Sequence, residues 1–253
     1  MIQDKALLKN YIENFYGYGN LRSDYWFIGK EEAGGETHQE INSRLKNWKN
    51  LNSEKVIDTY DFHKKITNEN DETFEFLFKN KVQRTWLGLI KMIFSLEDKK
   101  WTDFDIKKFR TESLGRAFSN NCLLEMFPLP SPKANQFNYS EWTDYKNREN
   151  YKNTIKNLRI NNIKQLINEN QPKFVIFYST DKEYCGYWNK ISEIDFDKVQ
   201  TNIFKERKKN SLIIKIAKKG NTTYAIVNHP ASRGIPDEYH KTIGQQIRTV
   251  ANN

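Results

Sequence analysis

Four short, largely apolar runs constrain the fold of this chain more than any other feature. They lie at residues 25–28, 122–127, 174–178 and 224–227. Apolar runs of this length without strict alternation are typical of strands that are buried on both faces, as in parallel sheets. Amphipathic stretches with helical spacing lie between them. We therefore expect an α/β fold: a three-layer α/β/α sandwich around a short, mostly parallel central sheet.

The helices and the remaining strands are predicted from the spacing of apolar residues. The predicted helices cover residues 3–16, 41–48, 74–96, 142–169, 181–190 and 236–250. A hairpin is predicted from residues 204–209 and 212–218, with its turn near Asn210 and Ser211. The polar residues 49–70 predict a long connection or an insertion. No repeat and no Pro/Gly/Ser-rich linker divides the sequence, so we expect residues 1–253 to form one domain.

Several classes of protein are excluded by composition. No run approaches the roughly 20 apolar residues of a membrane span, and residues 1–15 lack the uninterrupted apolar stretch of a signal peptide. Cys122 and Cys185 lie far apart, without the spacing of a disulfide scaffold or a zinc site. No glycine-rich nucleotide-binding motif is present. We expect a cytoplasmic monomer with no metal, no nucleotide cofactor and no membrane contact.

The charge of the chain has two interpretations, one of which is a polyanionic partner. Lysine and arginine outnumber aspartate and glutamate by 41 to 32, which gives a net charge of +9. This basic balance suits DNA or RNA. Chains rich in lysine and asparagine from AT-rich genomes reach a similar charge without such a partner. Charge alone does not decide between the two interpretations.

Three predicted strands end in unusual polar loops. In open parallel sheets, the ligand site lies beyond the carboxyl ends of the strands. The first loop, GKEEAGGE, covers residues 29–36. Its glycines let backbone N–H groups approach an anion, and its adjacent carboxylates, Glu31 and Glu32, are candidates for activating water. A solvated acidic turn explains the same residues.

The second loop begins with a carboxylate, Glu125, inside an apolar strand. An unpaired charge is very costly to bury, so Glu125 either has a Lys or Arg partner or belongs to a site. Prolines at positions 128, 130 and 132 stiffen the loop, and Ser131 lies between them. Such a loop can compress a nucleic-acid backbone, or it can simply end a strand.

The third loop, NHPASRG, covers residues 228–234. His229 follows a buried strand and can donate a hydrogen bond to a developing negative charge. A lone histidine in this position is also often structural. His38, His63 and His240 have no comparable setting, and we expect them to be structural.

Together, the three loops resemble those of the uracil-DNA glycosylase-like superfamily. Residues 29–32, 124–132 and 229–232 are similar, in order, to its water-activating loop, its base-reading strand with a Pro-bearing loop, and its His-Pro-Ser loop. The resemblance extends from about residue 25 to the C-terminus. It implies a DNA glycosylase that needs no cofactor and acts on a base rotated out of the stack.

The resemblance also implies a role for each matched position. Glu31 falls where the family places its water-activating Asp or Asn, and His229 falls on the histidine that stabilises the departing base. Phe127 is a candidate for stacking on that base. The residues in the loops that grip the DNA backbone or wedge the duplex are Gly34, Gly35, Ser131, Ser232, Arg233 and Ile235.

The sequence departs from the family's pattern at four positions. Glu31 replaces Asp or Asn, Glu32 replaces the usual Pro, Ala231 precedes Ser232, and Glu125 stands where the family reads the base with Asn. The amide of Asn accepts from uracil N3–H and donates to O4. An ionised Glu125 only accepts, so it would repel O4 and instead accept from an exocyclic amine, such as cytosine N4.

These departures predict a cytosine-type base. Normal cytosine cannot be the sole requirement, because the enzyme would destroy its host genome. We therefore expect a modified cytosine, such as the hydroxymethyl- or glucosyl-hydroxymethylcytosine of phage DNA, and a role in antiviral defence. Two alternatives remain open. One is a uracil-DNA glycosylase of base-excision repair, with Glu125 as a neutral acid, and the other is a non-catalytic reader of modified or damaged DNA.

Overall fold

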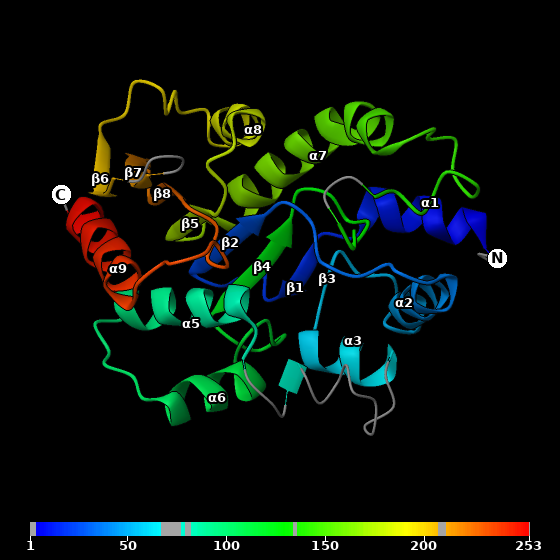
Figure 1. The fold of residues 1–253 in the computed structure, drawn as a ribbon, viewed down its shortest axis with the longest axis horizontal. Helices are drawn as coiled ribbons and strands as arrows, with labels where there is room; N and C mark the ends of the chain where they lie inside the picture. The colour runs from blue at the N-terminus through cyan, green and yellow to red at the C-terminus, as the bar shows by residue number, and fades with distance from the viewer. Residues whose placement is uncertain (1–3, 67–76, 79–81, 134–135, 207–210, 253) are drawn as a thin grey trace.

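One eight-stranded sheet forms the centre of the molecule (Figure 1). The computed structural model describes residues 4–66, 77–78, 82–133, 136–206 and 211–252. The order of the strands across the sheet is β3-β1-β4-β2-β5-β8-β7-β6. Their bounds are β1 Gly17–Gly19, β2 Tyr25–Gly29, β3 Val56–Ile57, β4 Asn121–Glu125, β5 Phe174–Phe177, β6 Thr201–Lys205, β7 Leu212–Lys219 and β8 Thr222–Val227.

The four strands at the centre, β4, β2, β5 and β8, are all parallel to their neighbours. They are the four runs expected from the sequence, so the mostly parallel central sheet is confirmed. Both flanks are antiparallel where they join this centre, β1 to β4 and β7 to β8. A hairpin is present as β6 and β7, but its first strand covers residues 201–205 rather than the predicted 204–209, and residues 207–210 lie outside the described residues.

Helices cover both faces of the sheet, which confirms the three-layer α/β/α arrangement. In Figure 1, α1, α7 and α8 lie on one side of the sheet and α5, α9 and α6 on the other. Their bounds, with those of the two remaining helices, are α1 Lys5–Asn14, α2 His38–Asn50, α3 Thr59–Ile66, α5 Arg84–Leu96, α6 Asp103–Glu112, α7 Arg148–Asn170, α8 Lys182–Ser192 and α9 Asp237–Asn252. No helix in the described part of the chain is long and apolar enough to cross a membrane.

The boundaries of two predicted helices were wrong at their amino ends. Helix α7 begins at Arg148 rather than at 142, because the side chain of Asn147 accepts from the N–H of Asn150 and caps the helix there. Helix α5 begins at Arg84 after the extended residue Gln83, whereas the prediction began at 74. Residues 74–76 and 79–81 of that prediction lie outside the described residues.

The segment 49–70, predicted to be a long connection or an insertion, contains regular structure in its described part. Strand β3 lies within it and pairs with β1, and helix α3 follows with Phe62 fully buried. Two apolar residues flanked by polar ones carry too little periodicity to reveal such a strand. Helix α6 was missed as well, although its capping box between Thr102 and Asp105 marks the start of a helix.

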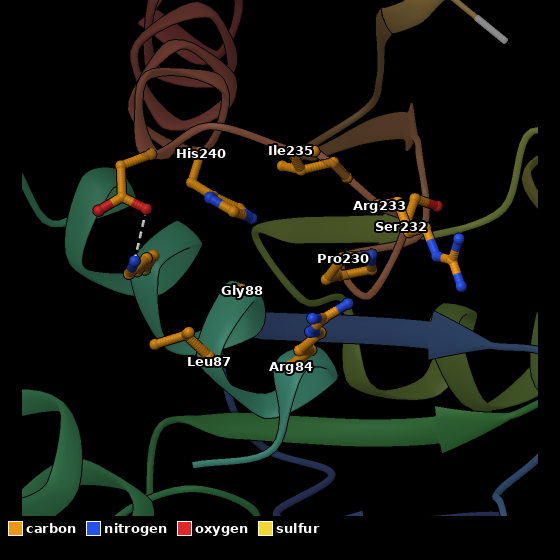
Figure 2. Close-up of a pocket in the computed structure, with 11 residues that line it drawn as sticks. Arg84, Leu87, Gly88, Pro230, Ser232, Arg233, Ile235 and His240 are labelled. Atoms are coloured by element: carbon orange, nitrogen blue, oxygen red, sulfur yellow. Dashed lines mark hydrogen bonds and ion pairs between the residues drawn. The ribbon is translucent and has the colours of Figure 1, made fainter. Parts of the chain in front are cut away.

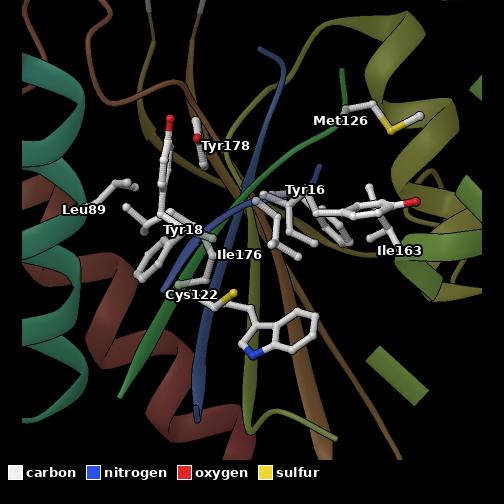
Figure 3. Packing of buried hydrophobic residues seen from close by; sticks show 14 of the residues in the cluster. Tyr16, Tyr18, Leu89, Cys122, Met126, Ile163, Ile176 and Tyr178 are labelled. Carbon is white, nitrogen blue, oxygen red and sulfur yellow. The ribbon is translucent and has the colours of Figure 1, made fainter. Parts of the chain in front are cut away.

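The helices reach the sheet closely enough to bury both of its faces. Gly88 of α5 faces Pro230, and a Cβ at this position would lie 2.5 Å from the Cβ of that proline (Figure 2). In the core, Leu89 of α5 and Ile163 of α7 pack from opposite sides of the sheet (Figure 3). The residues after the central strands are therefore held by a rigid scaffold.

Candidate active site

The carboxyl ends of the four central strands bring the three predicted loops to one edge of the sheet. Gly29, the last residue of β2, pairs with Glu125, the last residue of β4. The first two loops continue this pairing beyond the strands. The N–H of Phe127 donates to the carbonyl of Lys30 at 2.8 Å, and that of Ser131 donates to the carbonyl of Glu32 at 2.9 Å. The two loops therefore form one continuous backbone platform.

Glu125 has a hydrogen-bond partner on only one of its carboxyl oxygens. The hydroxyl of Tyr178 donates to Oε1 at 3.0 Å. Oε2 is buried and has no partner among the described residues. Burial raises the pKa of Glu125 well above its ordinary value, and the neighbouring carboxylates of Glu32 and Glu31 raise it further, against the lowering effect of Tyr178 and Arg159. Burial therefore favours the protonated, neutral form of the Glu125 carboxyl group.

The expected cationic partner of Glu125 binds its backbone rather than its carboxyl group. Arg159 of α7 is fully buried, and its guanidinium donates to the carbonyl oxygens of Glu125 and Met126 at 2.8 and 3.0 Å. It also donates to the carbonyl of Phe15 at 2.8 Å. Arg159 thus fixes the end of β4 without neutralising the carboxyl group.

Tyr178 reaches Glu125 across the end of β2, where Gly29 provides the space. A Cβ on Gly29 would lie 2.1 Å from the hydroxyl oxygen of Tyr178. The ring of Tyr178 also lies against His229, with 5.5 Å between the ring centroids. Glu125, Tyr178 and His229 thus form one contiguous row along the sheet edge, and Tyr178 is a member that the sequence analysis missed.

Glu31 is held by two partners that come from different helices. Its carboxylate forms an ion pair with Arg148, the first residue of α7, and accepts from the hydroxyl of Tyr184 of α8 at 3.3 Å. The side chain of Glu31 is 13% exposed. The carboxylate is therefore fixed by two side chains and keeps lone pairs that can accept from a water molecule.

Glu32 and the two glycines of the first loop are anchored to α2. Arg44 donates to Glu32 Oε2 at 2.7 Å and to Glu40 Oε1 at 3.1 Å. The N–H of Gly35 donates to the Glu40 carboxylate at 2.9 Å, and Gly34 has a φ of +121°. The Glu40 carboxylate thus occupies the place that we expected a phosphate to take beside Gly34 and Gly35.

His229 presents one ring nitrogen to the site as a donor. The N–H of Ala231 donates to His229 Nδ1 at 3.1 Å, so Nδ1 carries no proton. Burial and the charge of Lys30 lower the pKa of His229 to about 4, against the opposing effect of Asp181. The ring is therefore neutral at neutral pH, and Nε2 carries its proton. No described residue accepts a hydrogen bond from Nε2.

The remaining predicted residues differ in how accessible they are. Phe127 is 1% exposed and packs against the rings of Tyr151, Tyr184 and Tyr187, so a base could stack on it only if these rings moved. Ser131 donates its hydroxyl to the carbonyl of Lys133 at 2.7 Å. Ser232, a candidate for contact with the DNA backbone, is exposed; of the two wedge candidates, Arg233 is exposed and Ile235 is half-buried.

This edge combines an ion-paired carboxylate, a carboxyl group whose pKa is raised by burial, and a neutral histidine. The described residues contain no group of three or more His, Cys, Asp or Glu side chains placed to hold a metal ion. No family model matches the chain, and no curated protein matches it significantly.

Proposed function

We propose that this chain is a DNA glycosylase that hydrolyses the N-glycosidic bond of a flipped-out base and leaves an abasic site. The observation that carries the proposal is that Glu31, Glu125 and His229 lie at the carboxyl ends of central strands along one sheet edge, each in a different electrostatic state: Glu31 is in an ion pair, burial raises the pKa of Glu125, and burial lowers the pKa of His229. N-glycosidic hydrolysis needs these states: a carboxylate near the sugar, a group that reads the base, and a donor to the departing base. The resemblance of the three loops supports the same reaction.

In the proposed reaction, the bond between C1′ and the base nitrogen breaks and its electron pair stays with the base. Glu31, as a carboxylate, stabilises the positive charge on the sugar, orients water onto C1′ and takes the proton that the water loses. His229 donates from Nε2 to the base as negative charge develops. Preorganised donors of this kind are typically worth about 3–4 kcal/mol in the transition state.

Glu125 reads the edge of the base in this proposal. A neutral carboxyl group offers one O–H donor and one carbonyl acceptor. For a cytosine-type base, the O–H donates to N3 and the carbonyl accepts from N4–H. A modified cytosine is the proposed substrate, because removal of normal cytosine would destroy the host genome.

Uracil is the second candidate, because the raised pKa of Glu125 weakens the argument from the sequence against this base. The sequence argument against uracil assumed an ionised carboxylate, which repels O4. A neutral Glu125 can instead donate to uracil O4 and accept from N3–H, as an amide does. The neutral acid thus accommodates both bases, and the choice between them rests on the experiment.

The test is an abasic-site assay with DNA that contains uracil, cytosine, hydroxymethylcytosine or glucosyl-hydroxymethylcytosine. Alkaline cleavage reports each abasic site. We expect strand cleavage with modified cytosine and none with normal cytosine. Cleavage with uracil alone would keep the reaction and replace the substrate. Binding of these DNAs without any cleavage would overturn the enzyme and leave a reader of DNA.

A further inference from the structure

A cavity lies next to the third loop, on the α5 side of the sheet (Figure 2). It has a volume of about 400 Å³ and lies between α5, the start of α9 and residues 230–235. It shares no lining residue with the row formed by Glu125, Tyr178 and His229. The cavity is therefore separate from the candidate active site, although the third loop borders both.

Positive charge dominates the lining of this cavity. Arg84, Lys91 and Arg233 contribute three cations, and Asp237 contributes one carboxylate, which forms an ion pair with Lys91. Arg84 is exposed, and its guanidinium has no hydrogen-bond or ion-pair partner among the described residues. In a protein where most buried and half-buried charges are paired, a cation beside a cavity favours an anionic ligand.

His240 supplies a second, independent observation. This side chain of α9 is 5% exposed, and both of its ring nitrogens lack a hydrogen-bond partner in the described part of the chain. Buried polar groups normally have partners, so an unpartnered ring that lines a cavity indicates a missing ligand or water. Figure 2 shows His240 and Arg84 pointing into the same space from α9 and α5.

We propose that this cavity binds a phosphate group, held by Arg84 and His240, with the buried Lys91 adding positive charge to the lining. Phosphate offers several acceptor oxygens, which match the N–H donors of a guanidinium and of a histidine ring. Arg233, on the loop between the two sites, contributes charge at the opening. The inference does not require that the neighbouring site removes bases.

Two sources can supply the phosphate: the backbone of a DNA strand or a free nucleotide. The position of the cavity beside the third loop suits a strand whose base enters the neighbouring site. A volume of about 400 Å³ also lies within the range of small-molecule sites. The experiment therefore compares a short DNA duplex with inorganic phosphate and thymidine 5′-monophosphate.

The probe is the ring of His240, followed by NMR at neutral pH in the full chain, which contains only 4 histidines. We expect at least one of these ligands to shift the His240 ring signals. In Arg84→Gln we expect affinity for that ligand to fall about tenfold, as for the loss of one charged hydrogen bond. Arg22→Gln is the matched control, because Arg22 is exposed and precedes β2 at the opposite edge of the sheet.

A shift caused by the duplex at concentrations where thymidine monophosphate has no effect identifies a backbone phosphate, and the reverse identifies a free nucleotide. Unchanged His240 signals with every ligand, or equal affinities of the Arg84→Gln and Arg22→Gln variants, would overturn the proposal. Base release does not enter these measurements. A failure of the glycosylase proposal therefore stays distinguishable from a failure of this one.

Discussion

Tyr178 donates a hydrogen bond to Glu125 across the end of β2, at 3.0 Å from Oε1. Glu125 ends β4 and Tyr178 follows β5, and β2 lies between these two strands. The last residue of β2 is Gly29, which leaves the two side chains room to meet. The hydrogen bond between Tyr178 and Glu125 therefore depends on a glycine in the neighbouring strand.

Replacing Gly29 by Ala should disturb the site more than the fold. The new Cβ would lie 2.1 Å from the Tyr178 hydroxyl oxygen, so Tyr178 must move away from Glu125. We expect a loss of about 1–3 kcal/mol in the free energy of unfolding, measured in urea, and loss of base release. Gly186→Ala in α8 is the control, since a Cβ there meets nothing within 4 Å. Equal activity of the two variants would contradict the role of Tyr178.

Substitutions of Glu125 separate a neutral acid from a carboxylate. Glutamine keeps one donor and one acceptor, so Glu125→Gln should retain base release within about tenfold and keep the choice of base. Glu125→Ala should lose release by about 100-fold or more, because the buried tyrosine also loses its acceptor. Activity in Glu125→Asp together with an inactive Glu125→Gln would show that the ionised form is required.

Glu31 and Arg148 should behave as one unit in a double-mutant cycle. Their side chains are 13% and 21% exposed, so each single variant, Glu31→Gln or Arg148→Gln, removes an ion-pair partner from a partly buried charge. We expect each to lower the free energy of unfolding by about 1–3 kcal/mol, and the double variant to lower it by less than the sum. Additive losses would mean that the ion pair does not hold Glu31.

The protein should become less stable as the pH is lowered from about 6.5 to about 4. Burial lowers the pKa of His229 and of His240 to about 4 in the native state, from 6.5. In this window the unfolded chain binds protons that the native state does not bind, so acid favours unfolding. Thermal unfolding of the variant with both His229→Asn and His240→Asn should show a weaker dependence on pH across the window. An unchanged dependence would contradict the burial of these rings in solution.

Glu125 contributes in the opposite direction. Its pKa is raised in the native state, so the native state keeps a proton that the unfolded chain loses above the ordinary value of 4.5. Its contribution to stability is therefore largest in acid and is lost as pH rises through the native pKa. We therefore expect the stability of Glu125→Gln, relative to that of the wild-type chain, to be greater at high pH than at low pH.

The sequence was sufficient for the central strands because each is a compact apolar run, as in residues 224–227. It was insufficient for β3, where two apolar residues pair with β1 only through tertiary contacts. For the site, the sequence pointed to the strand ends but not to the partners. Arg148 reaches Glu31 from 117 residues away, and no local pattern encodes such a contact.

Tyr178 and His240 differ in how far the sequence could reveal them. Tyr178 directly follows β5, and a polar group at the end of a buried strand is a local signal of the kind that points to Glu31 and His229. His240 was expected to be structural, and only the cavity beside it reveals that its ring nitrogens have no partner among the described residues. The charge state of Glu125 also depends on burial by distant segments, so an argument from the sequence could not fix it.

The central claim is that the donor on His229 Nε2 drives departure of the base. Two substitutions separate the ring nitrogens: Asn can accept the Ala231 N–H in place of Nδ1 but lacks the outer donor, and Gln can place an amide donor near Nε2. The measurement is single-turnover release of free base, identified by mass spectrometry, from DNA that saturates each protein.

We predict that His229→Asn releases base about 100- to 1000-fold more slowly than the wild-type chain, with unchanged affinity for DNA. His229→Gln should lose less. Free base released at the wild-type rate by His229→Asn would contradict the claim, and so would the absence of free base from every DNA bound by the wild-type protein.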